Sequence, residues 1–514
     1  MKIFLKKKQF DILDGYLFSK SLRIKVFSIC NLQKIQDQYF VRKKSFRKVY
    51  YYIKEIGLKD TLLKILSRSR EKIRNEKYFS IGIGRVETSE SELLKKNQTV
   101  CFIAYNHPAC SERIVVHENF AFWVDISEMA WISSSKILWL EDFDMEKWWI
   151  DFLGWSPYSG EPAKNISMSV QEKITHYWKS ICNESKQTVQ LNKISTVSEI
   201  KQSKNNLKKN KKAVLFGYGN YAKTIILPNL HKKISLHAIH EIDPSQLLPF
   251  KSHIHYDVSP FPREIQYDIY FIAGYHHTHT SIAITALKHG ADVVIEKPLM
   301  TNKQDLEKLI DAMKNSKGEL YPCFQRRYQQ FNDAIFEDFK LKRGEPISYY
   351  AIIYEEVVPP LHWYRWPNSH SAVVSNGCHW IDHFLFLNNF HCVVSYYAKK
   401  TKNNEIIIAV ELENGATLSL TLSHIGSARI GMQDYIELRS GKNTARIINS
   451  KFYKSENENR IIRQKKINKF DSFRKMYQLI SENIIQKNAP RISDSVDRVF
   501  QVSALVLALD EIIA

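Results

Sequence analysis

The chain has 514 residues, of which 44% are hydrophobic, and it carries a net charge of +20. This length predicts two to three domains, and the hydrophobic content is sufficient for ordinary cores. No apolar run approaches the roughly 18 residues of a membrane-spanning helix, and the N-terminal apolar stretch is too short for a signal peptide. Seven scattered cysteines without a CxxC motif favour a reducing compartment, so we expect a cytoplasmic protein.

Much of the excess positive charge lies in the first 75 residues and in residues 201–212. No nucleic-acid-binding motif accompanies this charge, so we expect no specific binding of nucleic acid. Residues 201–212 have the composition of a solvated linker. A basic surface would still attract anionic substrates such as nucleotide sugars.

Residues 1–130 predict a β-rich domain. Within it, SIGIGRV (80–86) has a G-x-G-x-V strand pattern, and a later stretch reads VVHENF (115–120). These motifs are similar to the GroES-like domain of zinc-type alcohol dehydrogenases. Cys101 and Cys110 have no partners at zinc-ligand spacing, and no glycine fingerprint follows before residue 210. We therefore expect a degenerate domain with a structural or oligomerising role and no zinc chemistry.

Residues 131–210 are expected to form a helical and linker segment, with a helix at 171–185. Its tryptophans can stack on a sugar or a base, but such side chains more often fill a core or an interface. The five are Trp131, Trp139, Trp148, Trp149 and Trp155.

Residues 211–330 predict a dinucleotide-binding domain. AVLFGYGNYAKTIILPNL (213–230) has the pattern of a buried strand, a glycine turn and a helix. Gly217 permits the tight bend, Gly219 lets the backbone approach a diphosphate, and Ala222 allows the helix to pack closely on the strand. N–H groups at the start of the helix then face the anion. The predicted cofactor-binding residues of this turn are Gly217, Tyr218, Gly219, Asn220, Tyr221 and Ala222.

Glu241 follows LHAIH (236–240), which has the pattern of the second strand of such a domain. It lies 19 residues after Ala222, a spacing that suits the acidic residue that binds the adenosine ribose hydroxyls. An acid at this position would repel a 2′-phosphate. The sequence therefore favours NAD over NADP.

An apolar strand, a polar loop (274–279) and a helix (281–290) come next. The three histidines of this loop lack a carboxylate or cysteine at ligand spacing, so we interpret it as a lining of the nicotinamide pocket and expect no metal. A further strand then leads to Lys297. This lysine is expected at the carboxyl end of a parallel strand, where open α/β sheets bind their ligands.

A third cluster lies in SNGCHWIDHFLFL (375–387), whose apolar spacing from Trp380 predicts a buried helix. His379, Asp382 and His383 would share one face of it. His379 can exchange a proton with a hydroxyl or carbonyl, and Asp382 could orient its ring. The alternatives are a histidine satisfied in the core and a zinc pair, for which no third ligand is evident.

Residues 210–514 resemble the glucose–fructose oxidoreductase / inositol dehydrogenase (Gfo/Idh/MocA) family. The resemblance rests on FGYGNYA, TALKHGADVVIEKPL, CFQRRY (323–328) and GCHWID (377–382). It implies that Lys297 hydrogen-bonds the reacting hydroxyl, that Glu296 borders the nicotinamide ribose, and that His379 is the acid/base. It also places the pair Arg326 and Arg327 after the sixth strand. Further cofactor contacts are expected from Ala273, Gly274, Tyr275, His279, Glu296, Lys297 and Arg326.

The chain departs from this pattern at one position. Many family members carry an aspartate four residues before the histidine, where this chain has Ser375. Asn376 is the nearest polar alternative, and we include it among the catalytic residues with Lys297 and His379. The missing carboxylate puts the proton relay or the hydroxyl substrate class in question.

Residues 331–514 predict an α+β domain with an open, mainly antiparallel sheet. Alternating patterns at 404–425 and 434–450 predict two hairpins, the first turning at Asn414 and Gly415. Two amphipathic helices end the chain, the last with Ser493 as N-cap, and they can pack back on the Rossmann domain. In the resembled family such a sheet supports oligomers, so we expect a homo-oligomer.

These observations predict a cytoplasmic NAD-dependent oxidoreductase. It would transfer a hydride between nicotinamide and a secondary alcohol or ketone, on a sugar or nucleotide sugar of polysaccharide biosynthesis. One alternative is a catalytically degenerate protein in which NAD is structural or regulatory. Another is an imine or carbonyl reductase on the same fold.

Overall fold

A computed structural model gives the structure of the chain. By its contacts the chain divides into two compact units, one made of residues 1–44, 62–220 and 235–265 and the other of residues 45–61, 221–234 and 266–514. The described residues are 21–35, 77–91, 93–108, 113–118, 121–123, 136–139, 210–241, 254–257, 265–357, 369–426, 431–486 and 492–513, with single positions between them, among them 364.

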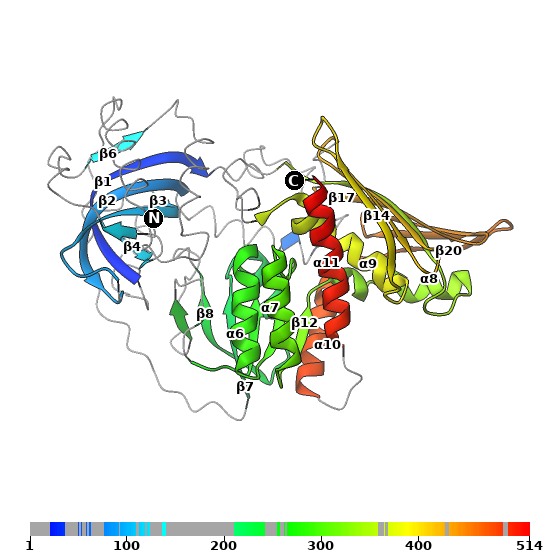
Figure 1. Cartoon of the computed structure of the whole chain (residues 1–514), viewed down its shortest axis with the longest axis horizontal. Coiled ribbons are helices and arrows are strands. Elements are labelled where there is room, and N and C mark those ends of the chain that lie inside the picture. The colour runs from blue at the N-terminus through cyan, green and yellow to red at the C-terminus, as the bar shows by residue number, and fades with distance from the viewer. Residues whose placement is uncertain are drawn as a thin grey trace. The chain divides into compact units, whose positions relative to one another are not determined.

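The N-terminal strands, blue and cyan in Figure 1, form one sheet of order β4-β1-β2-β3-β5, in which β6 also pairs with β1. In the part of β1 whose side chains are described, residues 22–26, every second residue is buried (Leu22, Ile24 and Val26), as expected where one face covers a core. Gly82 is required by packing, because a Cβ there would lie 2.2 Å from the ring of Phe102. The β-rich prediction is confirmed, while the likeness to a GroES-like domain stays a prediction. The strands are β1 (Ser21–Ile35), β2 (Lys77–Ser89), β3 (Thr99–Pro108), β4 (Arg113–His117), β5 (Ala121–Trp123) and β6 (Lys136–Trp139).

The predicted Rossmann sheet is confirmed, with strand order β12-β11-β10-β7-β8-β9. The pairs β8–β9, β10–β11 and β11–β12 are parallel. Three of its strands, β7, β10 and β11, are short apolar runs buried along most of their length, as in parallel sheets covered on both faces. They are β7 (Lys211–Phe216), β8 (Ile234–His240), β9 (His255–Asp257), β10 (Ile269–Ile272), β11 (Asp292–Ile295) and β12 (Leu320–Pro322).

The helix after the glycine turn is short and irregular, η4 (Ala222–Ile226) followed by η5 (Leu227–Asn229). Pro228 limits it, since proline has no N–H to donate. The loop predicted at 274–279 contains η7 (His276–Thr278), and the predicted helix runs as α6 (His279–Lys288) before Gly290 at a φ of +71°. The next helix, α7 (Lys303–Lys314), is capped by Asn302, whose side chain accepts the N–H of Asp305 at 2.8 Å.

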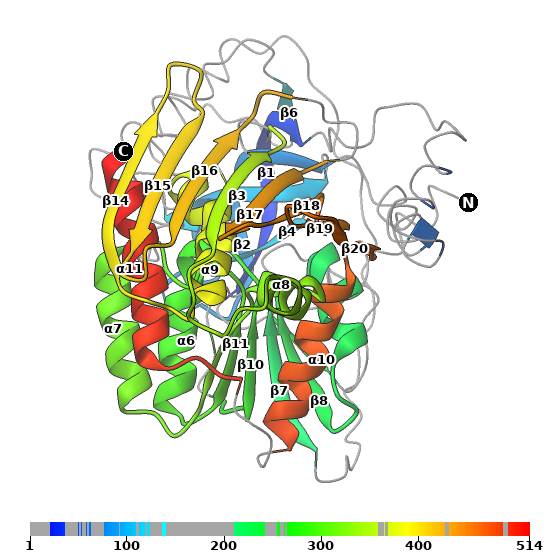
Figure 2. The same ribbon diagram turned by 90° about the vertical axis from the view of Figure 1, so that its right-hand side faces the viewer.

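The C-terminal sheet has eight strands in the order β14-β15-β16-β13-β17-β18-β19-β20, antiparallel except where β13 pairs with β16. Both predicted hairpins are confirmed, as β15–β16 and β17–β18, and Gly415 has the positive φ (+81°) that its turn requires. Figure 2 shows these strands with α8 (Phe331–Phe339) and α9 (Cys378–Leu387) beside them. The strands are β13 (Ser348–Tyr354), β14 (Val393–Lys400), β15 (Ile406–Leu412), β16 (Thr417–Ser423), β17 (Gln433–Ser440), β18 (Asn443–Ile448), β19 (Phe452–Glu456) and β20 (Ile461–Lys466).

Both C-terminal helices form, α10 (Asp471–Ile485) and α11 (Val496–Ile513). Figure 1 shows α11 beside α7, on which it packs. The N-cap prediction was wrong by two residues. Ser495 caps α11, because its hydroxyl accepts the N–H of Arg498 at 3.3 Å, whereas Ser493 lies outside the first turn.

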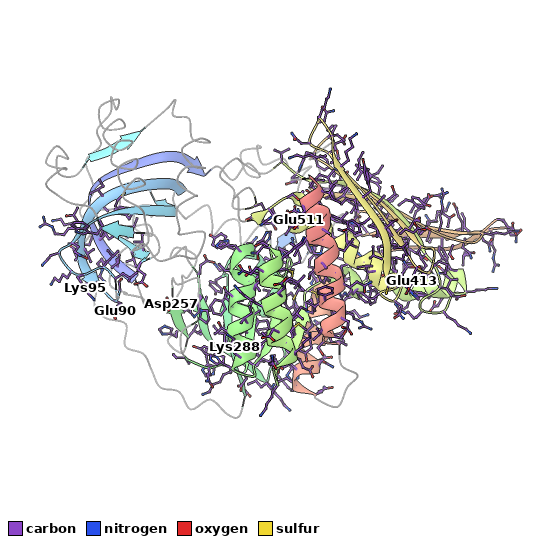
Figure 3. All side chains as sticks on the ribbon, viewed as in Figure 1. Glu90, Lys95, Asp257, Lys288, Glu413 and Glu511 are labelled. Carbon is purple, nitrogen blue, oxygen red and sulfur yellow. The ribbon has the colours of Figure 1, made fainter. Side chains whose placement is uncertain are left out.

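Figure 3 draws the side chains of the described residues and labels six charged ones, among them Lys288 and Glu413. Lys288 lies in the last turn of α6, where a positive charge favours the helix dipole. Glu413, in the β15–β16 turn, contacts His391 at 2.9 Å. No helix of the described residues has the length and apolarity to cross a membrane. The predicted helix at 171–185 and the tryptophan-rich segment, apart from Lys136–Trp139, lie outside the described residues.

Candidate active site

The glycine turn after β7 has the geometry of a diphosphate-binding turn. Gly217 has a φ of +89°, and its N–H donates to the carbonyl of His240 at 2.9 Å. Oε2 of Glu241 accepts the N–H of Tyr218 at 2.7 Å, so the predicted acid lies directly against the turn. A Cβ added at Gly219 would meet no atom within 4 Å, so the backbone there is open to a bulky anion. These residues fit a dinucleotide.

Tyr221 and Glu296 lie in contact, although 75 residues separate them. Oε1 of Glu296 accepts the Tyr221 hydroxyl at 2.8 Å and the Tyr477 hydroxyl of α10 at 2.6 Å. Burial raises the pKa of Glu296, and the two hydroxyls and Lys297 oppose that rise. The two tyrosines therefore fix this carboxyl at the end of β11. The predicted contact of Glu296 with the nicotinamide ribose stays a prediction.

Lys297 reaches the segment that the sequence singled out around position 376. Its Nζ donates to the backbone carbonyl of Ser375 at 2.7 Å and to Oδ1 of Asn376 at 3.1 Å. The ring of Tyr364 lies 5.6 Å away. Burial acts to lower the pKa of Lys297, but its polar neighbours, with Tyr364 first, outweigh burial and raise it. The side chain is a charged donor at neutral pH.

His379, on α9, is 7% exposed, and no side chain or backbone group of the described residues bonds its Nδ1. Phe324 and Trp380 lie edge-on to its ring. Burial and the charges of Lys297 and Arg326 hold the pKa of His379 well below its usual value. A neutral imidazole with an unbonded buried nitrogen can accept a hydrogen bond or a proton.

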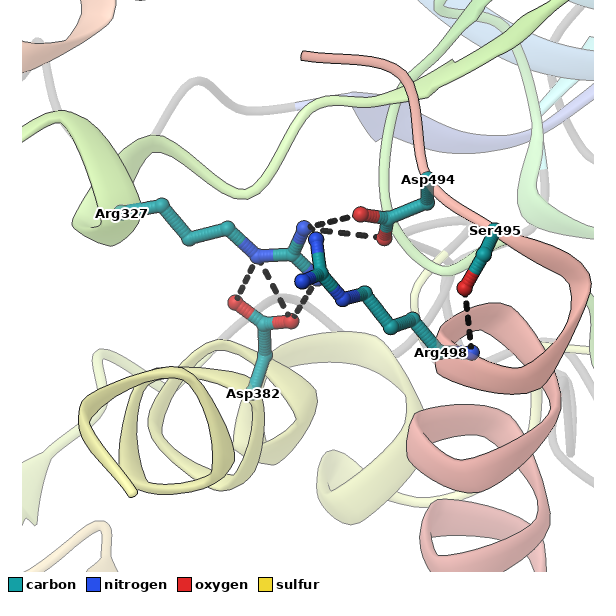
Figure 4. A network of polar contacts seen from close by, with 5 residues as sticks. All are labelled: Arg327, Asp382, Asp494, Ser495 and Arg498. Atoms are coloured by element: carbon teal, nitrogen blue, oxygen red, sulfur yellow. Dashed lines mark hydrogen bonds and ion pairs between the residues drawn. The ribbon is translucent and has the colours of Figure 1, made fainter. Parts of the chain in front are cut away.

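The prediction that Asp382 orients His379 was wrong. Asp382 instead binds Arg327, whose Nε lies 3.0 Å from Oδ2, and the same guanidinium binds both oxygens of Asp494 at 2.7 and 2.9 Å (Figure 4). His383 confirms the structural alternative, because its ring lies in the core between the Tyr349 hydroxyl and the Asn332 side chain. The Arg327 network therefore ties α9, which carries His379, to the residues just before α11.

Two predicted cofactor contacts have structural partners instead. Arg326 is buried, pairs with Asp434 of β17 at 2.6 Å and stacks over Trp380 at 4.4 Å. His279 bridges two carbonyls, with Nδ1 2.8 Å from Pro298 O and Nε2 3.2 Å from Gly274 O. Burial lowers the pKa of His279 to about 4. We therefore assign both side chains to shaping the site and leave them out of the proposed cofactor contacts.

The other predicted residues lie where the strand–turn–helix pattern put them. Ala273, Gly274 and Tyr275 form the half-buried segment between β10 and η7, Asn220 begins the first helical turn, and Ala222 is buried within it. Among the described residues no group of three or more His, Cys, Asp or Glu side chains gathers as a metal site.

Comparison with known proteins identifies the segment that contains the glycine turn and Lys297. Residues 211–322 match the family described as "Oxidoreductase family, NAD-binding Rossmann fold" (GFO_IDH_MocA). This segment belongs to the Gfo/Idh/MocA family. The protein YteT of Bacillus subtilis (strain 168) is 34% identical over 70 residues, which are 14% of this chain and 16% of YteT. The chain thus matches only about a sixth of that curated relative.

Weaker likenesses extend over 59% to 60% of the chain and 96% to 98% of three solved proteins. They are a dehydrogenase from Chromobacterium violaceum (14% identity, TM-score 0.49), the WlbA dehydrogenase from Bordetella pertussis in complex with NADH and UDP-GlcNAcA (18%, 0.47), and the UDP-N-acetylglucosamine 3-dehydrogenase GnnA from Acidithiobacillus ferrooxidans (15%, 0.47).

One residue of this candidate site was missed in the sequence. Glu355 directly follows β13, and its side chain is 4% exposed. Burial raises the pKa of Glu355 to about 7, while Lys297 and the Asn376 side chain oppose the rise. The only sequence signal for Glu355 was an acidic residue at the end of a strand with alternating apolar residues. Such a pattern does not indicate which side chain the acid contacts.

Proposed function

We propose that the protein is an NAD-dependent oxidoreductase that interconverts a secondary alcohol and a ketone, on a sugar or nucleotide sugar. The observation that supports it most is the charged Lys297, which follows a Rossmann strand and donates into the segment that precedes His379. The family of residues 211–322 supports the oxidoreductase class. Open α/β sheets bind ligands at the carboxyl ends of their strands, which is where Lys297 lies.

Each group has a defined task in this proposal. Bound NAD supplies the hydride acceptor or, when reduced, the hydride donor. The Lys297 ammonium donates to the substrate oxygen and stabilises the negative charge that develops there during oxidation. The neutral His379 imidazole accepts the hydroxyl proton. Asn376 holds Lys297 in position through its Oδ1.

Substrate screening tests this function directly. The purified full-length chain is incubated with NAD and, in turn, with UDP-N-acetylglucosamine, other nucleotide sugars, free cyclitols and cyclic imines with NADH, and absorbance at 340 nm is followed. A native mass spectrum of the same sample reports any dinucleotide bound after purification. Turnover of imines alone would favour the reductase alternative. Dinucleotide binding without turnover of any class would favour a regulatory protein, an alternative that Ser375 supports.

Glu241 should determine the choice of cofactor. Glu241→Gln keeps an acceptor for the Tyr218 N–H but removes the charge that would bind ribose hydroxyls and repel a 2′-phosphate. We expect about tenfold weaker NAD binding, since hydrogen bonds to charged groups are worth about 1.5–3 kcal/mol, and a smaller gap between NAD and NADP. Calorimetric titration with each cofactor measures both, and Glu307→Gln, on the exposed side of α7, is the control. An unchanged ratio of the two affinities would assign Glu241 to the turn alone.

The eight-stranded sheet supports the proposed homo-oligomer. Its outer face carries a row of exposed apolar side chains that lie in register on neighbouring strands. Ile352 of β13 pairs with Tyr435 of β17, Tyr435 with Ile448 of β18, and Ile448 with Phe452 of β19. All four are more than a third exposed. A continuous apolar strip of this kind typically marks an interface.

Light scattering after size exclusion tests this interface. Ile352→Lys places a charge at the β13 end of the row, where the apolar side chain is 60% exposed, and is expected to convert the oligomer to a smaller species at micromolar concentration. Ile425→Lys, at an exposed position just after β16, is expected to leave the mass unchanged. A wild-type monomer at these concentrations, or an Ile352→Lys protein of wild-type mass, would refute an interface at this row.

A further inference from the structure

Glu355 is a buried carboxyl that no part of the proposed mechanism uses. It is the first residue after β13, and its N–H donates to the Ser423 carbonyl at 2.8 Å, which continues the pairing of β13 with β16 by one residue. The backbone therefore holds its side chain on the inner face of the sheet. Oε1 has no hydrogen-bond partner among the described residues. A buried carboxyl oxygen left unbonded is costly, so its retention calls for a physical reason.

Asn376 links this carboxyl to Lys297. Its Oδ1 accepts from Lys297 Nζ at 3.1 Å, and its side chain lies close enough to the Glu355 carboxyl to lower the pKa of that carboxyl. An amide has one accepting and one donating end, so Oδ1 serves the lysine and the NH₂ group serves the glutamate. Lys297, Asn376 and Glu355 thus form a chain that connects β11, the segment before α9 and β13.

Glu296 is the other carboxyl near Lys297, and its charge also raises the pKa of that lysine. Glu296 already accepts two tyrosine hydroxyls at its Oε1. Ser375 presents only a backbone carbonyl to the ammonium. Other titratable groups near Lys297 and Glu355 are Tyr364, Cys378 and His379, and Nδ1 of His424 lies 3.3 Å from the backbone oxygen of Glu355.

We propose that Glu355 is a second carboxylate partner of Lys297, beside Glu296, and that it acts through Asn376 in a chain that has serine at position 375. Glu355 is a positioning residue, because it acts on the substrate only through Lys297. When its carboxyl is ionised, it holds the ammonium protonated and the Asn376 amide in one orientation. When it is protonated, that support is lost. Because burial raises its pKa to about 7, this change falls in the neutral range. The kinetic consequence rests on the proposed function, whereas the charge coupling does not.

The coupling is measured without a substrate. Lys297 is labelled in the full chain with trace acetic anhydride over a pH series, and mass spectrometry of its peptide gives the titration of that amine. Glu355→Gln is expected to lower the pKa of Lys297 by about one unit. At a pH below the pKa of Lys297 in both proteins, the reactive neutral amine is then about tenfold more abundant in the variant, and the labelling rate rises by the same factor. Glu356→Gln, the next carboxylate along the chain, is the matched control and should match the wild type. Glu355→Asp should recover part of the shift.

The following outcomes separate the possibilities. NAD titration of Glu355→Gln within about threefold of wild type shows that the variant is folded. An unchanged Lys297 titration in that folded variant overturns the proposal. If the variant does not fold, the wild-type protein alone tests the coupling. Its curve of Lys297 labelling rate against pH must show a second inflection near pH 7, and a curve with a single inflection overturns the coupling. If a substrate is found, kcat/KM of the wild type should decrease as the pH is lowered from 7. This decrease should be absent from the pH profile of Glu355→Gln. Failure of all substrates would refute the proposed function and leave the labelling result intact.

Discussion

Replacing Lys297 with methionine is expected to lower kcat/KM by about 10²- to 10³-fold, as for the loss of one donor to a developing oxyanion. Methionine has similar length and no charge, so the packing at the end of β11 is largely kept. Nζ loses its contacts with Ser375 and Asn376. NAD affinity should change little, since in the proposed site the adenosine end of the cofactor is held by the glycine turn and Glu241. Initial rates at 340 nm and calorimetric NAD titration give the two quantities.

Lys308→Met, on the exposed face of α7, is the matched control for this experiment. It removes the same charge from a position outside the site and should retain wild-type turnover. If the wild type turns over a substrate and Lys297→Met does so equally well, Lys297 does not stabilise the transition state. Turnover by neither protein, with NAD still bound by both, would favour the catalytically degenerate alternative.

Replacing Arg327 with methionine is expected to destabilise the C-terminal unit by about 3–5 kcal/mol, the range for breaking a buried ion pair. Asp382 is fully buried and Asp494 nearly so, and both would lose their counter-charge. Asp382 has a pKa already raised to about 6 by burial, and loss of Arg327 would raise it further. Urea unfolding followed by circular dichroism measures the loss.

The pH dependence of the stability lost in Arg327→Met follows from the raised pKa of Asp382. A carboxyl whose pKa is raised in the folded state contributes less stability as pH rises through that pKa. The Arg327→Met defect should therefore be larger at pH 8 than at pH 5. Arg343→Met is the control, since Arg343 makes an exposed ion pair with Asp333 at 3.4 Å and should cost less than 1 kcal/mol. An equally small cost for Arg327→Met would show that the network is dispensable.

Local patterns were sufficient for much of the fold. The turn at Gly217, the acid at Glu241 and the hairpin at Gly415 were predicted because each depends on residues close in the chain. A positive φ, a strand period and a helix cap are decided by sequence neighbours, so composition and spacing reveal them. The predicted N-cap, Ser493, lies two residues before the observed one, and errors of this size are common at helix ends.

The pairing of charged groups in the site depended on the tertiary structure. Helical spacing placed Asp382 beside His379, yet its partner is Arg327, 55 residues away in the chain. Arg326 binds Asp434 across 108 residues, and Asn376 contacts Lys297 across 79. The sequence alone determined where the Rossmann strands, the glycine turn and Lys297 lie along the chain. Only the packing of β13, α9 and β11 decided which acid pairs with which base, because a charge buried in a core is stabilised by whichever partner the fold brings within a few ångströms.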